Sequence, residues 1–427
     1  VSALLALGVQ EQRRGGKLPP ARVFLLLLHL ALDRDSSIRA VLNSLALGLG
    51  FPASWRNKTP HGTSIAQARD RLGWEPVRDV FRAQKTPQQI CDVWRGRSVV
   101  ALDGACLRAP RSIANRAGLG EPSASLRTAS HPLLRTVLAV GVYSHWVYEA
   151  AFAPYRKQQP DQKIGEPSLA RSLLGRLPAD AIVVGDRGFA NARFLSAVRD
   201  QGLDFVVRAL KNGKSFKLRK VESLPDGSDL VRLRSKSGDL LLRRIVFGYR
   251  TRRVVPKKIK KGKAYERKRK QGETTRVTLV TSLLEPERYP GKEVAGLYRD
   301  RWEVEHVFKE LKVQLGAKKP VFRGQTPTRV LQEAYATLIV HRCLWANAAR
   351  AAERASVPAL RMSFEICLRL TRTAARLSGP GLASRVLDLL ACSAVLPKRR
   401  DRHYPREVLA LTPKYRVRKV FPANAVA

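Results

Sequence analysis

Three acidic residues occupy positions from which their side chains could bind a metal ion together. Asp103 follows the apolar run 99–102, Asp186 follows the apolar run 181–185, and each is followed within two residues by a glycine. Each aspartate is expected to close a short strand, and strand ends are where an open α/β sheet presents ligand groups. Either residue could equally cap an ordinary turn. The pair therefore needs a third ligand before it predicts a metal site.

The third ligand comes from a helix expected over 292–315. At about 100° per residue, one stripe of this helix places a carboxylate among side chains that can bind phosphate. The stripe consists of Tyr298, Arg301, Glu305 and Lys312. The apolar face beside it, which would pack on a sheet, consists of Leu297, Val304, Val307, Phe308, Leu311 and Leu315. The alternative is a plain amphipathic helix with an Arg301–Glu305 ion pair at i,i+4 spacing.

These carboxylates suit a hard divalent cation. Mg²⁺ prefers oxygen ligands, and a two-metal site holds its ions about 4 Å apart between a few carboxylates. The 427 residues include 79 Lys and Arg against 35 Asp and Glu, a formal net charge of +44. Such an excess costs stability through self-repulsion unless a polyanion offsets it. Asp103, Asp186 and Glu305 therefore predict a metal site that acts on nucleic acid.

The elements that must position these residues predict an α/β protein. Three strands, a helix, a further strand and later helices are typical of a mixed sheet flanked by helices. The expected strands are 98–102, 134–143, 146–153, 181–185, 204–210, 230–234, 240–249 and 277–282. Besides 292–315, the expected helices are 20–32, 38–47, 63–72, 169–177, 327–351, 363–377 and 382–395. We expect five regions: helices over 1–90, a core over 95–210 and 277–325, a basic β-rich insertion over 211–276, and helices over 326–427.

Two basic segments are candidates for DNA contact. Between Arg250 and Arg276, 13 of 27 residues are Lys or Arg, which indicates either a solvated loop or an arm that follows phosphates, and the overall charge favours the arm. The helix over 63–72 carries Arg69 and Arg71 among Ser and Gln residues, a composition that suits a DNA-contacting helix. An ordinary solvated helix explains the same pattern equally well.

The spacing Y-x2-R-x3-E-x6-K, with Trp302 after the arginine, resembles the YREK motif of bacterial DDE transposases of the insertion-sequence-four type. The resemblance extends to Val99–Gly104, to the run Asp186-Arg187-Gly188-Phe189 and to the N-terminal run 68–73, so it covers most of the chain in the family's order. One departure is Ala105, where the family often has Thr. That position is not a carboxylate ligand.

The resemblance implies a ribonuclease-H-like core with a mostly β insertion and helical N- and C-terminal regions. It implies that Asp103, Asp186 and Glu305 hold two Mg²⁺ ions, for which Mn²⁺ can substitute. By similarity, the other residues of the motif and Arg187 hold the DNA backbone. Trp302 would stack on an unpaired base, or would simply pack beside the core.

The implied reaction is cut-and-paste transposition of an insertion sequence, by end nicking, hairpin formation and resolution, and strand transfer. The implied partners are double-stranded DNA at transposon ends and target, and a second copy of the chain in a synaptic complex, with the C-terminal helices as the candidate dimer surface. The implied location is the bacterial cytoplasm, at the nucleoid. Two alternatives use the same scaffold: an inactive or domesticated nucleic-acid-binding protein, and a stand-alone nuclease.

Several other classes of site and protein are excluded. The five Cys residues form no C-x-x-C pair, which argues against a zinc ribbon and a disulfide framework and fits a reducing cytoplasm. The longest apolar run, 23–32, has about ten residues where a membrane span needs roughly 20. Gly213-Lys214-Ser215 resembles the end of a phosphate-binding loop, but Arg208 stands where its first glycine is required. His306 has no H-E-x-x-H context, and the other histidines are dispersed in sequence, so we expect a surface histidine rather than a zinc ligand.

Overall fold

The computed structural model forms two compact units. Unit 1 comprises Val1–Pro122, His131–Pro178 and Trp302–Pro397, and unit 2 comprises Ser123–Ser130, Ala179–Arg301 and Lys398–Ala427. The structure describes residues 18–48, 60–124, 127–129, 131–162, 164–209, 216–235, 238–251, 254–256, 267–269, 273–316, 321–377, 381–397 and 417–419.

The sheet of unit 1 is antiparallel, with the strand order β6-β5-β2 and with β1 paired to β2. The strands are β1 (Val93–Trp94), β2 (Arg97–Arg108), β5 (Leu133–Gly141) and β6 (Val147–Pro154). The adjacent strands predicted over 134–143 and 146–153 are confirmed as a hairpin: β5 and β6 are joined by a short turn through Ser144 and His145. Almost every residue of β5 is buried, so this strand lies in the middle of the unit's core.

Strand β2 does not end at Asp103 and Gly104, which corrects the expected turn there. It continues to Arg108, pairing Asp103 with Leu138 and Gly104 with Val137 on β5. The pairing continues because residues 105–107 are apolar enough to extend the strand. Gly104 serves close packing rather than a turn, since a Cβ atom placed there would lie 2.3 Å from Cδ of Glu166.

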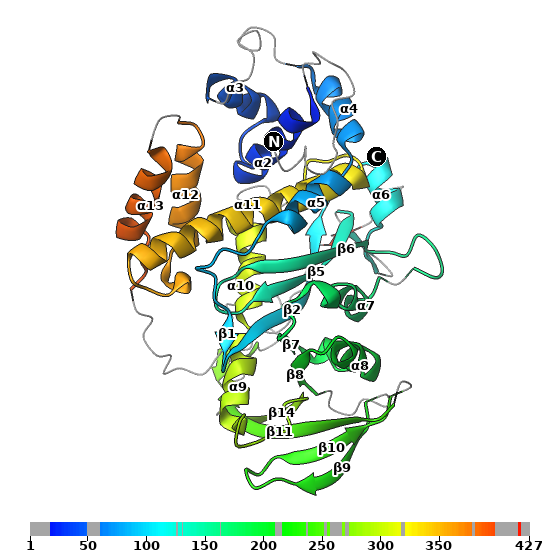
Figure 1. Ribbon diagram of the computed structural model, residues 1–427. Helices are drawn as coiled ribbons and strands as arrows, with labels where there is room; N and C mark the ends of the chain where they lie inside the picture. Colours follow the sequence, from blue (N-terminus) through cyan, green and yellow to red (C-terminus); the bar gives the residue numbers. More distant parts are fainter. Residues whose placement is uncertain are drawn as a thin grey trace. The chain divides into compact units, whose positions relative to one another are not determined.

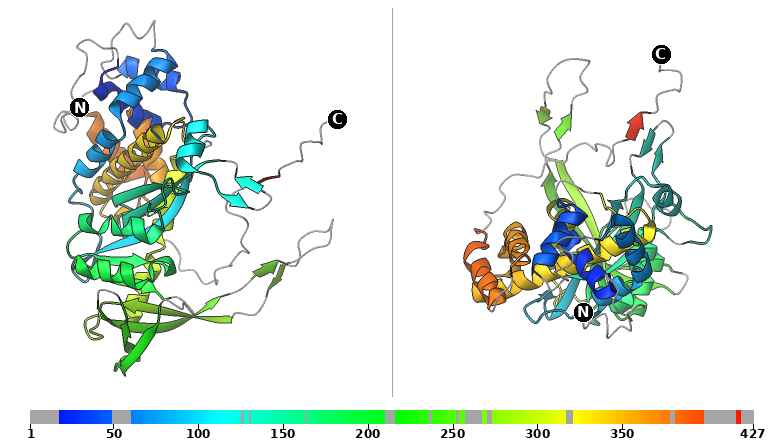
Figure 2. Two further views of the ribbon diagram at one scale, coloured as in Figure 1. Left: turned by 90° about the vertical axis from the view of Figure 1, so that its right-hand side faces the viewer. Right: turned by 90° about the horizontal axis from the view of Figure 1, so that it is seen from above.

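The helices of unit 1 are arranged around the long helix α11 (Pro327–Arg354). Helices α2, α4, α5, α12 and α13 all pack against it (Figure 1). Seen from above, α12 and α13 lie together at one end of α11 (Figure 2). These and the other helices are α2 (Pro20–Leu32), α3 (Ile38–Gly48), α4 (Gly62–Leu72), α5 (Glu75–Ala83), α6 (Ile113–Leu119), α7 (Glu166–Arg171), α10 (Glu303–Lys309), α12 (Phe364–Ala374) and α13 (Leu382–Ser393), with 3₁₀ turns at Leu174–Arg176 and Ala359–Arg361.

Most helix predictions in unit 1 are confirmed to within a few residues. The exception is 169–177, where α7 begins and ends earlier and a 3₁₀ turn follows it. The core under the N-terminal helices consists of Leu26, Leu30, Val41, Leu42, Leu45 and Ile65. None of the helices that the structure describes is long and apolar enough to cross a membrane.

Unit 2 contains a mixed sheet with the strand order β7-β8-β14-β11-β10-β9. Only β7 and β8 run parallel; the other neighbours are antiparallel. The strands are β7 (Ile182–Gly185), β8 (Asp204–Arg208), β9 (Leu218–Ser223), β10 (Asp229–Leu233), β11 (Leu240–Thr251) and β14 (Glu273–Thr281). Its helices are α8 (Ala192–Asp200) and α9 (Gly291–Asp300), with a 3₁₀ turn at Arg187–Phe189. The predicted α/β class with a mixed sheet is confirmed.

The expected insertion is rich in strands, since β9, β10 and β11 fall within 211–276. Two small ribbons also belong to unit 2: β12 (Val254–Pro256) with β13 (Arg267–Arg269), and β15 (Val417–Lys419) with β4 (Arg127–Ala129) and β3 (Ser123–Ala124). Much of the basic arm expected over 250–276, and the motif 213–215, lie outside the described residues.

The single helix predicted over 292–315 is divided, which corrects that prediction. Helix α9 ends at Asp300, α10 begins at Glu303, and a π-helical turn (Glu310–Gln314) follows directly. The π-turn is closed by the N–H of Leu315, which donates to the carbonyl of Glu310 at 2.8 Å. Single π-turns of this kind are frequent at functional sites. They also change the angular spacing, so 100° per residue no longer fixes where Lys312 points.

Candidate active site

In unit 1, Asp103 and helix α10 lie on the same side of the sheet. Asp103 and Leu107 point to one face of β2, because alternate residues of a strand share a face. A small cavity on that face is lined by Leu107 and by Leu138, the cross-strand neighbour of Asp103. Its opposite wall is formed by Phe308 and Leu311. The segment that begins with α10 therefore covers the face of β2 to which Asp103 points.

The two carboxylates of unit 1 sit at the border of this packed layer. Asp103 and Glu305 are both half-buried, whereas the apolar neighbours Val304 and Val307 are fully buried. One oxygen of Asp103, Oδ1, accepts the backbone N–H of Gly104 at 2.8 Å. The structure thus brings two of the three predicted ligands to one side of the sheet of unit 1.

Asp186 belongs to unit 2, where it ends strand β7 as predicted. Its Oδ1 accepts the N–H of Gly188 at 2.7 Å and thereby caps the 3₁₀ turn. Strand β8 runs parallel beside β7, with Val207 opposite Gly185, so Arg208 is the next residue along β8 just as Asp186 is along β7. Asp186 is half-buried at the carboxyl ends of two adjacent parallel strands, where open sheets bind ligands.

Tyr298 and Arg301 lie in the same part of unit 2 as Asp186. Burial raises the pKa of the Tyr298 hydroxyl, the charges of Arg301 and Arg208 oppose that rise, and the charge of Asp186 adds to it. The Arg301 guanidinium lies 5.8 Å from the centre of the Tyr298 ring, and Arg301 is 7% exposed. The charges of an aspartate and two arginines therefore act on the tyrosine hydroxyl, and these group types suit both a cation and a phosphate.

Lys312 lies on the π-turn in unit 1. Its Nζ lies 5.1 Å from the centre of the Phe308 ring, a cation–π contact within the same helical segment. Trp302 is 40% exposed, and Arg187 is exposed. Trp302 and Arg187 are therefore accessible to DNA, whereas Lys312 is half-buried.

The prediction that Arg69 contacts DNA is corrected by its burial. Arg69 is 4% exposed, and its guanidinium donates to Glu333 at 2.9 Å and to the side chain of Gln332 at 3.1 Å. Arg69 therefore joins α4 to α11, and these contacts with Glu333 and Gln332, rather than its burial alone, commit its guanidinium to the protein. Arg71 is exposed on the same helix, and its contact with DNA stays a prediction.

His306 is not an isolated surface histidine, which corrects that expectation. Its Nδ1 lies 2.8 Å from Oε2 of Glu303, and the same oxygen lies 3.1 Å from Nε2 of His145. The other nitrogen of His145 lies 2.9 Å from Oε1 of Glu310. Glu310 in turn accepts N–H groups from His341 at 2.8 Å and from the Trp345 indole at 3.0 Å.

The protonation of this network follows from its burial and its ion pairs. Burial alone would lower the pKa of His145, but Glu310 and Glu303 raise it to about 9. Burial alone would raise the pKa of Glu310, but His145 and His341 lower it to about 2. Burial lowers the pKa of His341, which therefore donates as a neutral ring. The network holds α10 and the π-turn against the β5–β6 turn and α11.

Comparison with known proteins shows the family to which the chain belongs. A family profile described as "Transposase DDE domain" matches residues 94–341, more than half of the chain and the part that carries all three acidic residues. The chain belongs to the family of DDE transposases. A second profile, "Insertion element 4 transposase N-terminal", matches residues 1–82, so the helices α2 to α4 are those of the insertion-sequence-four branch.

Two relatives agree with this assignment. The chain is 26% identical to "Transposase InsG for insertion sequence element IS4" of Escherichia coli (strain K12), over 97% of this chain and 90% of that protein. It is 28% identical to "Putative transposase InsZ" of the same strain, over 42% of this chain and 60% of that protein. Membership of this transposase family makes DNA the class of substrate, cleavage and transfer of DNA the class of reaction, and a divalent metal the general requirement.

Several residues described above are absent from the sequence-based predictions, among them Arg208, Glu166 and His145. Arg208 could have been found, since it lies near the end of the predicted strand 204–210; it ends the observed strand β8, which runs parallel to β7. Glu166 and His145 gave no such signal. Their positions beside Gly104 and Glu303 depend on the packing of segments far apart in the sequence.

Proposed function

We propose that this transposase-family protein catalyses cut-and-paste transposition of an insertion sequence. Its carboxylates Asp103, Asp186 and Glu305 hold two Mg²⁺ ions, with Mn²⁺ as a substitute. The order of steps is nicking of the transposon end, hairpin formation by the freed 3′-hydroxyl, opening of the hairpin, and attack of the 3′ ends on target DNA.

The observation that supports this proposal best is the position of Asp103 and Glu305 in unit 1. The strand and the helix that carry them pack face to face, both carboxylates are half-buried, and the donor set consists of oxygen atoms. Carboxylate oxygens are the ligands that Mg²⁺ prefers. When bound, divalent ions lower the pKa of an attacking water and neutralise charge on the phosphoryl group.

The remaining residues of the motif bind and orient the DNA backbone. Arg301 and the Tyr298 hydroxyl, beside Asp186 in unit 2, donate to a phosphate near the scissile bond. Lys312 contributes a further positive charge, and Arg187 assists. Trp302, which is 40% exposed, stacks on a base that is unpaired in the hairpin.

The protein acts on double-stranded DNA as a homodimer, because two transposon ends must be brought together. The C-terminal helices are the proposed dimer surface, and Leu377 and Leu389 there are each more than half exposed. The site of action is chromosomal DNA in the bacterial cytoplasm.

The test is cleavage of DNA ends that flank the reading frame, in Mg²⁺ or Mn²⁺, by the wild type and by the variants D103N, D186N and E305Q. Wild type should produce nicks, then hairpins, then joined products. Each variant should lose cleavage by several orders of magnitude while its DNA affinity changes little, because only a metal ligand is removed. Variants D200N and E222Q, which alter exposed acidic residues on α8 and β9, serve as matched controls and should cleave normally.

Each failure has a specific meaning. Binding without nicking by wild type would make the chain an inactive DNA-binding member of the family. Cleavage without joining to a target would make it a nuclease. Near-normal hairpin formation by any one of the three variants would remove that residue from the ligand set.

A further inference from the structure

A second group of side chains of the types that bind metals lies in unit 1, and it shares no residue with the three carboxylates of the proposed active site. His145 occupies the β5–β6 turn, and Glu303 and His306 lie on α10. One ligand atom from each lies within 4.8 Å of the other two. We propose that His145, Glu303 and His306 bind one zinc ion.

The distances within the group are close to those of a zinc site. Tetrahedral zinc with nitrogen and oxygen ligands at about 2.0–2.2 Å separates neighbouring ligand atoms by about 3.3–3.5 Å. Glu303 Oε2 lies 3.1 Å from His145 Nε2 and 2.8 Å from His306 Nδ1. Small shifts of these side chains would therefore admit the ion. Glu303 and His306 are three residues apart, the Glu-x-x-His spacing with which one helix supplies two metal ligands.

The surroundings of His145 match those of a metal-bound histidine. Such a histidine usually donates its second N–H to a carboxylate, which fixes the ring and leaves the other nitrogen for the metal. Here Nδ1 of His145 faces Glu310 at 2.9 Å, and Nε2 faces Glu303 at 3.1 Å. Glu310 is itself held by His341 and Trp345, so the carboxylate that faces Nδ1 of His145 is fixed in place.

The group is closed on one side and open on the other. The side chain of His145 is 6% exposed, that of Glu303 is 25% exposed and that of His306 is 36% exposed. An ion can enter from the side of His306 and keep a water as its fourth ligand, as in other sites with three protein ligands. Bound there, zinc joins the β5–β6 turn to α10, the helix that carries Glu305.

Zinc binding is measured on the full-length protein, freed of metal with a chelator and then incubated with one equivalent of zinc before gel filtration. Wild type should retain one zinc per chain. Cobalt in place of zinc should give the visible absorption of a tetrahedral ion. Loss of an outer-layer partner typically costs 10–100-fold in affinity, so removing a direct ligand in H306A should cost more than about 100-fold.

Two further variants keep the test independent of folding and of catalysis. H145N suits the left-handed backbone at position 145, where φ is 57°, because Asn tolerates that conformation; it should lose zinc as H306A does. H61N alters a histidine at the start of α4 and should bind zinc normally, as should D103N.

The proposal fails if wild type retains no zinc, or if H306A and H145N bind it as tightly as wild type does. It also fails if D103N loses the zinc, since the ion would then belong to the acidic site. Zinc should raise the thermal midpoint of wild type and of H61N, with no rise for H306A. DNA cleavage is not a readout of this experiment, so zinc binding and transposition can fail separately.

Discussion

At the scale of single residues, close packing against Glu166 explains why a glycine follows Asp103. Gly104 lies in the middle of β2, and the carboxylate end of Glu166 occupies the space that a side chain at position 104 would fill. Glu166 also lies 3.9 Å from Arg135, in an ion pair that is partly exposed. The glycine therefore lets the first turn of α7 approach the strand that carries Asp103.

Gly104→Ala should destabilise the protein by less than about 1 kcal/mol, below the usual cost of overpacking, since the partly exposed end of the Glu166 side chain can move aside. In an E166A background the same substitution should instead stabilise the protein by roughly 0.5–1 kcal/mol, because the contact with Glu166 is gone and Ala is more favourable than Gly within a strand. Urea unfolding of the two single variants and the double variant measures this coupling.

Gly62→Ala is the matched control, because nothing lies within 4 Å of a Cβ atom there; it should be neutral or slightly stabilising. If Gly104→Ala changes the free energy of unfolding equally in the wild-type and E166A backgrounds, the contact with Glu166 does not require a glycine at position 104.

At the scale of elements, buried arginines hold the N-terminal helices and the sheet to α11. Arg69 on α4 pairs with Glu333, whose side chain is 11% exposed. Arg342 on α11 donates to backbone carbonyls of Phe81, Val147 and Tyr148, which fastens α5 and β6 to the same helix. Burial lowers the pKa of Arg342 to about 9. These buried arginines contribute part of the positive charge that, from composition alone, would be attributed entirely to DNA binding.

Arg69→Met should cost up to about 3–5 kcal/mol in the free energy of unfolding, because it removes the ion-pair partner of the buried Glu333 carboxylate, which then retains the backbone N–H of Arg323. Arg71→Ala, two residues away and exposed, should change stability by less than about 0.5 kcal/mol. Denaturant unfolding of both variants compares them directly. If Arg69→Met were as stable as Arg71→Ala, the pair with Glu333 would not secure α4.

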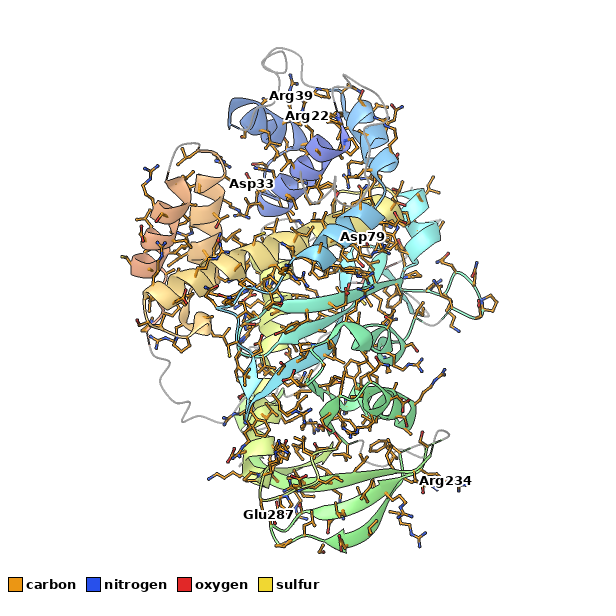
Figure 3. The ribbon with its side chains drawn as sticks, viewed as in Figure 1. Arg22, Asp33, Arg39, Asp79, Arg234 and Glu287 are labelled. Atoms are coloured by element: carbon orange, nitrogen blue, oxygen red, sulfur yellow. The ribbon has the colours of Figure 1, made fainter. Side chains whose placement is uncertain are left out.

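At the scale of the whole molecule, the charge of +44 makes DNA binding depend strongly on salt. Exposed arginines are found in both units: Arg39 on α3 in unit 1, and Arg234 just after β10 in unit 2 (Figure 3). Contacts of this kind supply affinity without sequence preference. Comparison of single variants is therefore needed to distinguish contacts near the scissile phosphate from this non-specific electrostatic binding.

Lys312→Ala should weaken DNA binding and reduce the slope of log Kobs against log salt by about 0.9, the value for one phosphate contact. Arg299→Ala is the control, because Arg299 is an exposed cation on α9 that lies off the predicted stripe. Binding measured across a salt series gives both slopes. An unchanged slope for Lys312→Ala would mean that Lys312 does not touch a phosphate.

The sequence by itself determined what depends on near neighbours along the chain. Apolar runs fixed β7 and the β5–β6 hairpin, helical periodicity fixed α11, and the motif around Glu305 indicated the family. Each of these follows from spacing within one element, which local backbone geometry sets. The interruption after Asp300 and the π-turn were not predictable in this way, because a periodic pattern is the same in a continuous helix and a divided one.

Only the tertiary structure decided which polar residues are buried and with what partners. Arg69 and Arg71 look alike in sequence, yet one is enclosed against α11 and the other is exposed. His145 and His306 are far apart along the chain, yet both contact the carboxylate of Glu303. Burial and long-range pairing are set by what packs against an element, and that information is held by other segments of the chain.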